Sequence, residues 1–208
     1  MKEYKKKIEF KEIQSLEYNL LKRFDEFAKE NNIMYFLSGG SCLGAVRHQD
    51  FIPWDDDIDV CMLRKDYDKL IALVKDNRYL DTERKYKFLL PLDDNYIYPY
   101  MKLVDDSTIV FEKDIKRQYA TGVWMDIFPM DIWPDEKETL RKIMKKHRFY
   151  KMMNKIYVAG NLTTMKKNIL TTEQASFLKQ YNFSLYQERF EVLCEAQKAE
   201  KDGHLNFA

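Results

Sequence analysis

Hydrophobic and polar residues follow regular periods over the N-terminal part of the chain. Between positions 13 and 28 apolar residues recur every three or four positions, which predicts an amphipathic helix. An apolar run at 33–37 predicts a buried strand that stops at a Ser-Gly-Gly-Ser turn, and a short helix over 41–47 follows. The pattern then predicts a strand over 57–62 and an amphipathic helix over 67–74.

The rest of the chain divides into a strand-rich part and a helical part. Beyond Pro134 the sequence becomes charged and helical, with a break at Gly160-Asn161. The predicted strands cover 86–92, 96–104, 108–111 and 123–128, and the predicted helices cover 135–157 and 172–201. We therefore expect the α+β class, with a mixed β-sheet flanked by helices and followed by a helical C-terminal part.

Chain length and composition favour one main globular domain. The chain has 208 residues, of which 45% are hydrophobic and 33% charged, while glycine and proline are scarce. We expect a core over 1–134 and a helical extension over 135–208 that packs on it.

Net charge and cysteine content restrict the partners and the compartment. The net charge is +1, so no global field favours nucleic acid. The three cysteines lack CxxC spacing, which argues against zinc and disulfides and favours a reducing cytoplasm. The N-terminus turns charged before a signal-peptide core can form, and no apolar run reaches the ~20 residues of a membrane span. Segment 141–150 mixes basic and apolar residues, so it could contact the inner face of the membrane peripherally. A solvated helix is the preferred interpretation.

Four carboxylates crowd into positions 55–59, directly before and within a predicted strand. Side chains alternate along a strand, so Asp57 and Asp59 share one face. At roughly 6 Å and an effective dielectric of about 20, their repulsion is on the order of 2 to 3 kcal/mol. A divalent cation such as Mg²⁺ removes this penalty because it binds carboxylates and phosphates. The alternative is an acidic surface turn.

Two further features support a metal and phosphate site. Gly39, Gly40 and Ser41 follow a strand and open a helix, where backbone N–H groups favour phosphate, although their spacing matches neither the P-loop nor the dinucleotide-binding motif. Asp126 is a lone carboxylate among apolar residues, so it either binds the metal or accepts structural hydrogen bonds. Three other acids are substitutes for it, namely Asp105, Asp106 and Asp131. A glycine turn followed by a strand with Asp-x-Asp resembles the layout of the nucleotidyltransferase fold.

The same residues carry a resemblance to a family. The segment 39–59, GGSCLGAVRHQDFIPWDDDID, resembles the LicD family of phosphocholine transferases, and so do MKLVD at 101–105 and MDIFPMD at 125–131. The resemblance spans about residues 12–134. The chain stops without the Tyr-Gly-Asp-like motif with which members continue, so we expect a truncated C-terminal part.

The resemblance implies a reaction and its site. It implies a nucleotidyltransferase-like fold and transfer of a phospho-alcohol, typically phosphocholine from CDP-choline, to a cell-surface glycan or a teichoic acid precursor. The implied catalytic residues and ligands of Mg²⁺, or of Mn²⁺, are Asp57, Asp59 and Asp126. The implied donor-phosphate ligands are Arg47, His48 and Lys102, although Arg47 and His48 equally suit a helix end.

Other donors and other functions remain open at this stage. A choline head group favours aromatic faces, and the candidates are Trp54, Trp124, Tyr96, Tyr98 and Tyr100. Aromatic residues on strands more often belong to the core, so CDP-ribitol and CDP-glycerol stay alternatives. The competing functions are transfer of a nucleoside monophosphate to a small hydroxylated acceptor and non-catalytic binding of a glycan or a nucleotide.

Overall fold

The computed structural model describes residues 6–158 apart from 92, 94, 114 and 133. The chain divides into two compact units. The first unit comprises Met1–Phe111 and Ala120–Met130, and the second comprises Glu112–Tyr119 and Asp131–Ala208. The predicted boundary at residue 134 stays a prediction.

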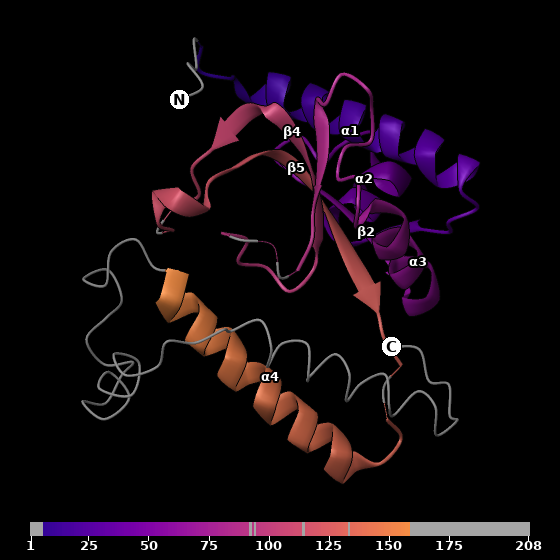
Figure 1. Cartoon of the computed structure of the whole chain (residues 1–208), viewed down its shortest axis with the longest axis vertical. Helices are drawn as coiled ribbons and strands as arrows, with labels where there is room; N and C mark the ends of the chain where they lie inside the picture. The colour runs from indigo at the N-terminus through magenta and orange to yellow at the C-terminus, as the bar shows by residue number, and fades with distance from the viewer. Residues whose placement is uncertain (1–5, 92, 94, 114, 133, 159–208) are drawn as a thin grey trace. The chain divides into compact units, whose positions relative to one another are not determined.

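The first unit contains a five-stranded open sheet (Figure 1). Its strands are β1 (Phe36–Leu37), β2 (Ile58–Leu63), β3 (Tyr86–Leu89), β4 (Met101–Val110) and β5 (Thr121–Met130). The order across the sheet is β1-β2-β5-β4-β3, in which β2 and β5 run parallel and the other neighbours antiparallel. The sheet is therefore mixed, as the sequence predicts, and β5, the last strand in the chain, lies at its centre.

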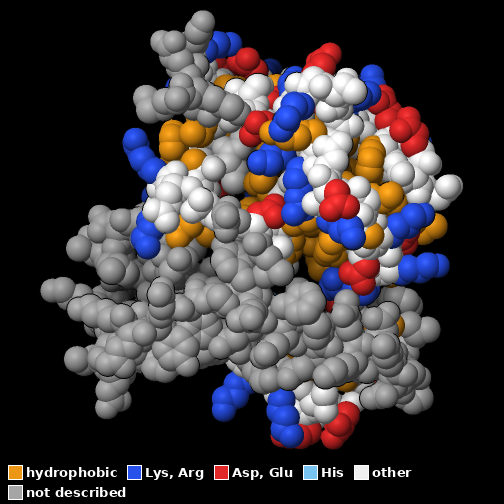
Figure 2. Space-filling model, in the orientation of Figure 1, with side chains coloured by type: hydrophobic (Ala, Val, Ile, Leu, Met, Phe, Trp, Pro, Cys, Tyr) orange, Lys and Arg blue, Asp and Glu red, His pale blue; other side chains and the backbone are white. Residues whose placement is uncertain are grey.

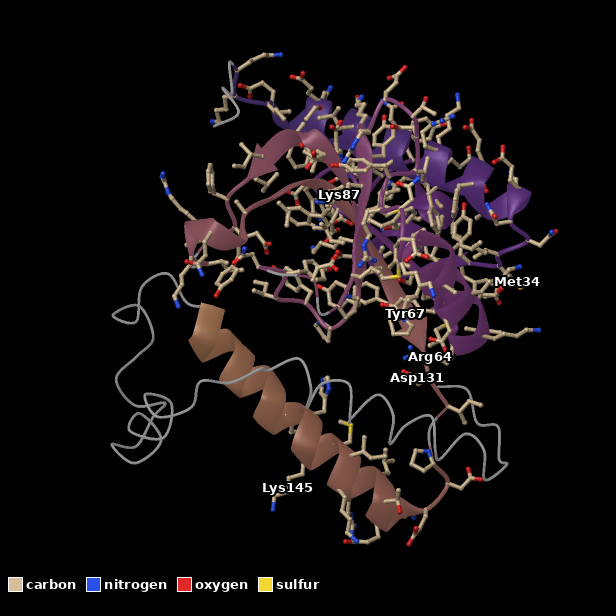
Figure 3. All side chains as sticks on the ribbon, in the orientation of Figure 1. Met34, Arg64, Tyr67, Lys87, Asp131 and Lys145 are labelled. Carbon is tan, nitrogen blue, oxygen red and sulfur yellow. The ribbon has the colours of Figure 1, made fainter. Side chains whose placement is uncertain are left out.

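Helices α1 (Phe10–Glu30) and α3 (Arg64–Val74) pack on the sheet. The apolar stripe of α1 is buried at Leu20, Phe24 and Ala28, and the Phe24 ring meets Phe88 of β3 edge to face. At the start of α3, the Tyr67 hydroxyl accepts a hydrogen bond from the N–H of Met101 at 2.9 Å (Figure 3). The helix α1 predicted from the periodicity is confirmed, because burial of one apolar face is what that period provides.

Alternation along β2 separates a core face from a second face of the sheet. Ile58, Val60 and Met62 are buried in the core, whereas Asp59 and Cys61 between them are half-buried. The second face therefore carries the polar positions of the central strands.

Two strand predictions in the second half of the sheet are wrong. The residues of 96–100 are irregular, and the supposed separate strand at 108–111 is largely the end of β4. A bulge accommodates the polar residues between the two predicted strands. There, Thr108 Oγ1 donates to the carbonyl of Asp105 and accepts from the N–H of Val123, both at 2.8 Å. These hydrogen bonds let the strand continue through a stretch that reads as a turn.

Other boundaries move by a few residues. Of the predicted strand 33–37 only Phe36 and Leu37 pair with β2, and β2 itself begins at Ile58 rather than at Asp57. β3 ends at Leu89. Such shifts are ordinary at the ends of elements.

The second unit contains a 3₁₀ turn (Arg117–Tyr119) and helix α4 (Lys137–Val158), which lies where the helix 135–157 is predicted. Arg141 and Lys142 are exposed and lie 4.0 and 3.9 Å from Glu138 one turn earlier. The predicted break at Gly160-Asn161 and the helix 172–201 fall outside the described residues. No helix within the described ranges has the length and apolar character needed to cross a bilayer.

Charged side chains show no separation by sign on the visible surface of the first unit. Figure 2 shows Lys and Arg interspersed with Asp and Glu, with apolar side chains between them. This distribution agrees with the net charge of +1.

Candidate active site

Three side chains form a row across the middle of the sheet. Asp59 of β2 is aligned with Asp126 of β5, and Asp126 is aligned with Lys102 of β4. Residues aligned on neighbouring strands place their side chains on the same face. The row brings two predicted metal ligands together with a predicted phosphate ligand from three distant segments of the chain.

The glycines that begin helix α2 (Gly39–Arg47), called here the glycine turn, lie against this row. The N–H of Asp59 donates to Ser41 Oγ at 2.8 Å. Gly39 has φ +54°, and a Cβ there would lie 3.2 Å from Oδ2 of Asp59. A Cβ on Gly40 would overlap Oδ2 of Asp55. The missing side chains therefore let the start of α2 approach the carboxylates closely.

Helix α1 holds the acidic segment that leads into β2. Gln14 Nε2 donates to the carbonyl of Asp55 at 2.8 Å. Asp57 is half-buried and directly precedes β2. These contacts place the segment beside the start of β2.

The carboxylates repel one another. Burial, and then the charges of Asp59 and Asp55, raises the pKa of Asp57 to about 6. Burial, and then the charge of Asp126, raises the pKa of Asp59, while Lys102 lowers it. The predicted penalty of crowding acids on one face is therefore present, and nearby positive charge relieves it only in part.

Glu17 is a further acid that sequence reasoning missed. It lies on α1 with 2% of its surface exposed, and its Oε2 accepts no hydrogen bond from the described residues. Burial, and then the charges of Asp56 and Asp57, raises its pKa to about 9. A signal was available, because position 17 falls on the apolar stripe, four residues after Ile13 and three before Leu20.

Lys102 and Asp126 form a buried ion pair. Nζ of Lys102 lies 2.7 Å from Oδ1 of Asp126, and the two residues are 1% and 8% exposed. The sequence left two roles open for Asp126, metal binding and a structural polar contact. The ion pair with Lys102 is a contact of the second kind.

Arg47 and His48 lie away from the glycine turn. Arg47 ends α2 and His48 caps it, so both lie about 12 Å along the helix axis from Gly39. Both side chains are exposed. Their role as phosphate ligands stays a prediction. Their position agrees with the alternative, in which both are residues of a helix end.

The substitutes for Asp126 lie elsewhere. Asp105 follows Lys102 by three positions on β4, so its side chain points to the opposite face of the sheet. Its carboxylate accepts hydrogen bonds from the N–H and the hydroxyl of Ser107 and lies 3.6 Å from Lys85. Asp106 is the next residue of β4 in the bulge, and Asp131 belongs to the second unit.

Of the aromatic candidates, Tyr96, Tyr98 and Tyr100 pack ring on ring, and Trp124 shares the Lys102 ammonium with Tyr98 and Tyr100. Trp54 is 78% exposed, and Tyr96 is buried, with its hydroxyl donating to the carbonyl of Tyr100 at 2.6 Å. The rings of Tyr98, Tyr100 and Trp124 surround the ammonium of Lys102. A cation of the protein itself therefore occupies these three ring faces.

The donor set suits a divalent ion by its chemistry. Asp55, Asp57, Asp59 and Asp126 provide oxygen ligands, which Mg²⁺ and Mn²⁺ prefer. Burial, and then the charges of neighbouring acids, raises the pKa of Asp57 and of Asp59. Among the described residues no three carboxylate, His or Cys side chains converge as a ready metal site. The fit to the ion therefore rests on the oxygen chemistry of these side chains.

Comparison with known proteins identifies relatives of the chain. A family model described as the nucleotidyltransferase domain of LicD, FKTN and FKRP matches residues 32–170. The lipopolysaccharide cholinephosphotransferase LicD of Haemophilus influenzae is 32% identical over 171 residues, which cover 79% of this chain and 62% of that protein.

Two shorter matches accompany it. An uncharacterized protein of Rickettsia prowazekii is 47% identical over 49 residues, 24% of this chain and 18% of that protein. The human ribitol 5-phosphate transferase FKRP is 53% identical over 34 residues, 16% of this chain and 7% of that protein. The chain thus spans less than two thirds of the length of each of these relatives.

Proposed function

The chain belongs to the LicD/FKTN/FKRP nucleotidyltransferase-domain family, and from this premise we propose that it is a metal-dependent phospho-alcohol transferase. We propose phosphocholine as the transferred group, CDP-choline as the donor, a cell-surface glycan or teichoic acid precursor as the acceptor, and the cytoplasm as the location. The proposal includes the nucleotidyltransferase-like fold. Its main structural support is the row of Asp59, Asp126 and Lys102 beside the glycine turn.

The proposed reaction moves one phosphoryl group. The acceptor hydroxyl oxygen attacks the phosphorus that bears choline, the bond from that phosphorus to CMP breaks, and CMP leaves. A carboxylate of the cluster accepts the hydroxyl proton. Gly39, Gly40 and Ser41 offer backbone N–H groups to the donor phosphates, and Lys102 supplies positive charge beside them.

Asp57, Asp59 and Asp126 would hold Mg²⁺ or Mn²⁺. The bound ion supplies charge neutralisation for the pyrophosphate and the leaving CMP.

We predict that the protein releases CMP from CDP-choline in the presence of Mg²⁺ and an acceptor, and that EDTA stops the release. A panel with CDP-ribitol and CDP-glycerol, analysed by chromatography, checks the choice of alcohol. Asp59→Asn should lower turnover by about 10²- to 10⁴-fold, since a metal ion contributes several kcal/mol to the transition state.

Asp76→Asn, in the loop after α3, removes a carboxylate of the same charge and should leave turnover unchanged. A nucleotide attached to the acceptor would replace this proposal with nucleotidyl transfer. Full activity of Asp59→Asn would refute the metal assignment.

A further inference from the structure

The ammonium of Lys102 is held at one point of the second face of the sheet. The strand register fixes its backbone beside Asp126, and Nζ lies 2.7 Å from Oδ1 of that residue. Nζ also lies 4.1 Å from the ring centroid of Trp124, 4.4 Å from that of Tyr98 and 5.8 Å from that of Tyr100. One carboxylate and three ring faces thus surround a single cation.

Burial makes this arrangement specific. Lys102 is 1% exposed, and a buried ammonium is costly unless charges or ring faces replace its water. Asp126 is 8% exposed, so its carboxylate also needs a cation close by. A cation is therefore expected beside Oδ1 of Asp126, and the ammonium of Lys102 occupies this cation position.

We propose that Lys102 is a tethered counter-ion that occupies the cation position at Asp126 and competes there with the divalent ion. This inference rests on the proposed function, in which the metal shares Asp126. It accounts for the state of Asp126, whose carboxylate is engaged by the ammonium. Among the described residues, no three acids converge on one point.

Competition has a measurable consequence for metal affinity. A cation beside the site opposes the incoming ion, and its removal takes that opposing charge away. The rings keep the displaced ammonium close to the row. Lys102 therefore stays within the site, where the donor phosphates are expected.

The test measures Mn²⁺ binding to the full chain by electron paramagnetic resonance at constant ionic strength. We expect Lys102→Met to lower the dissociation constant at least about tenfold relative to the unsubstituted protein, about 1.4 kcal/mol. The control is Lys87→Met on β3, labelled in Figure 3, which removes the same charge one strand away, opposite Val104. The control should stay within about twofold of the unsubstituted protein.

Circular dichroism shows whether Lys102→Met folds, and a second variant keeps the test decisive if it does not. Trp124→Leu keeps both charges but removes the nearest ring face, so it should also tighten Mn²⁺ binding, by about threefold. An unchanged or weaker affinity in folded Lys102→Met overturns the inference, and Trp124→Leu decides in the same way if Lys102→Met does not fold.

The outcomes separate this inference from the proposed function. If the unsubstituted protein binds Mn²⁺ but neither variant binds more tightly, only the tethered counter-ion is wrong. If neither it nor the variants bind Mn²⁺, the metal dependence in the proposed function is wrong as well. Binding that is detected only in Lys102→Met supports the competition.

Discussion

At the scale of single residues, environment decides what each acid can do. Asp57 and Asp59 were predictable, because their spacing on a strand puts both carboxylates on one face whatever the rest of the fold does. Glu17 lies on the apolar stripe of α1, so its burial could have been read from local spacing. The partnership of Lys102 with Asp126 could not, because strand register creates it.

Glu17 gives a pH-dependent prediction. Its pKa is about 9 in the folded state against an ordinary value of 4.5, so between these values the folded state holds more protons than the unfolded state. The neutral carboxyl of Glu17 contributes to the free energy of unfolding fully below pH 4.5, and this contribution is lost as the pH rises to about 9. Stability therefore falls with rising pH. Glu17→Gln should remove this fall.

Urea unfolding in EDTA measures the effect. The stability difference between Glu17→Gln and the unsubstituted protein should grow by about 1 to 3 kcal/mol from about pH 5 to about pH 8 in favour of the variant. Glu26→Gln, which removes an exposed carboxylate of α1, should show a constant difference. A pH-independent difference for Glu17→Gln would mean that the acid is not held neutral.

At the scale of elements, local patterns predicted helices well and strand extents poorly. The stripe over 13–28 suffices for α1 because one face of an isolated helix already defines its core contacts. In contrast, β4 passes through three polar residues because side-chain hydrogen bonds from Thr108 sustain the bulge. Such long-range contacts leave no periodic signal in the sequence.

Helix α2 gives a prediction at this scale, because two of its glycines face different neighbours. A Cβ on Gly40 meets the carboxylate of Asp55, whereas a Cβ on Gly44 lies 2.7 Å from the carbonyl of Asp50. Gly44→Ala should cost about 1 to 3 kcal/mol of stability through overpacking against backbone, whereas Gly40→Ala should cost less because the side chain of Asp55 can move away. Only Gly40→Ala should also weaken Mn²⁺ binding.

Isothermal titration of the two folded variants with Mn²⁺ compares the affinities. The Gly44→Ala variant serves as the matched control, since it disturbs the same helix away from the carboxylates. Equal affinities in both variants would show that the start of α2 does not shape the metal site.

At the scale of the whole molecule, the sheet order assembles the site. The mixed sheet was predictable as a class, but the sequence could not show that β5 lies between β2 and β4. That placement aligns Asp126 with Asp59 on one side and Lys102 on the other. The residue pattern supplied Asp126 as a candidate and the resemblance supplied Lys102, and the topology supplies their alignment.

Metal binding should stabilise the whole fold, because the acids are close together only in the folded chain. At about ten times its dissociation constant, Mg²⁺ should raise the free energy of unfolding by about 1.4 kcal/mol. Urea unfolding with MgCl₂, compared with NaCl at the same ionic strength, measures this gain. The gain should be absent in Asp59→Asn, and an equal gain from NaCl would point to general screening.

The central place of β5 also constrains how the nascent chain can fold. While the ribosome is still adding residues before Thr121, the β1–β2 and β3–β4 pairs have no common neighbour, and each leaves an unpaired edge. Insertion of β5 closes both edges in one step and delivers Asp126 at the same moment. A polypeptide that is stalled before Thr121 therefore exposes unpaired strand edges, which can pair with other chains.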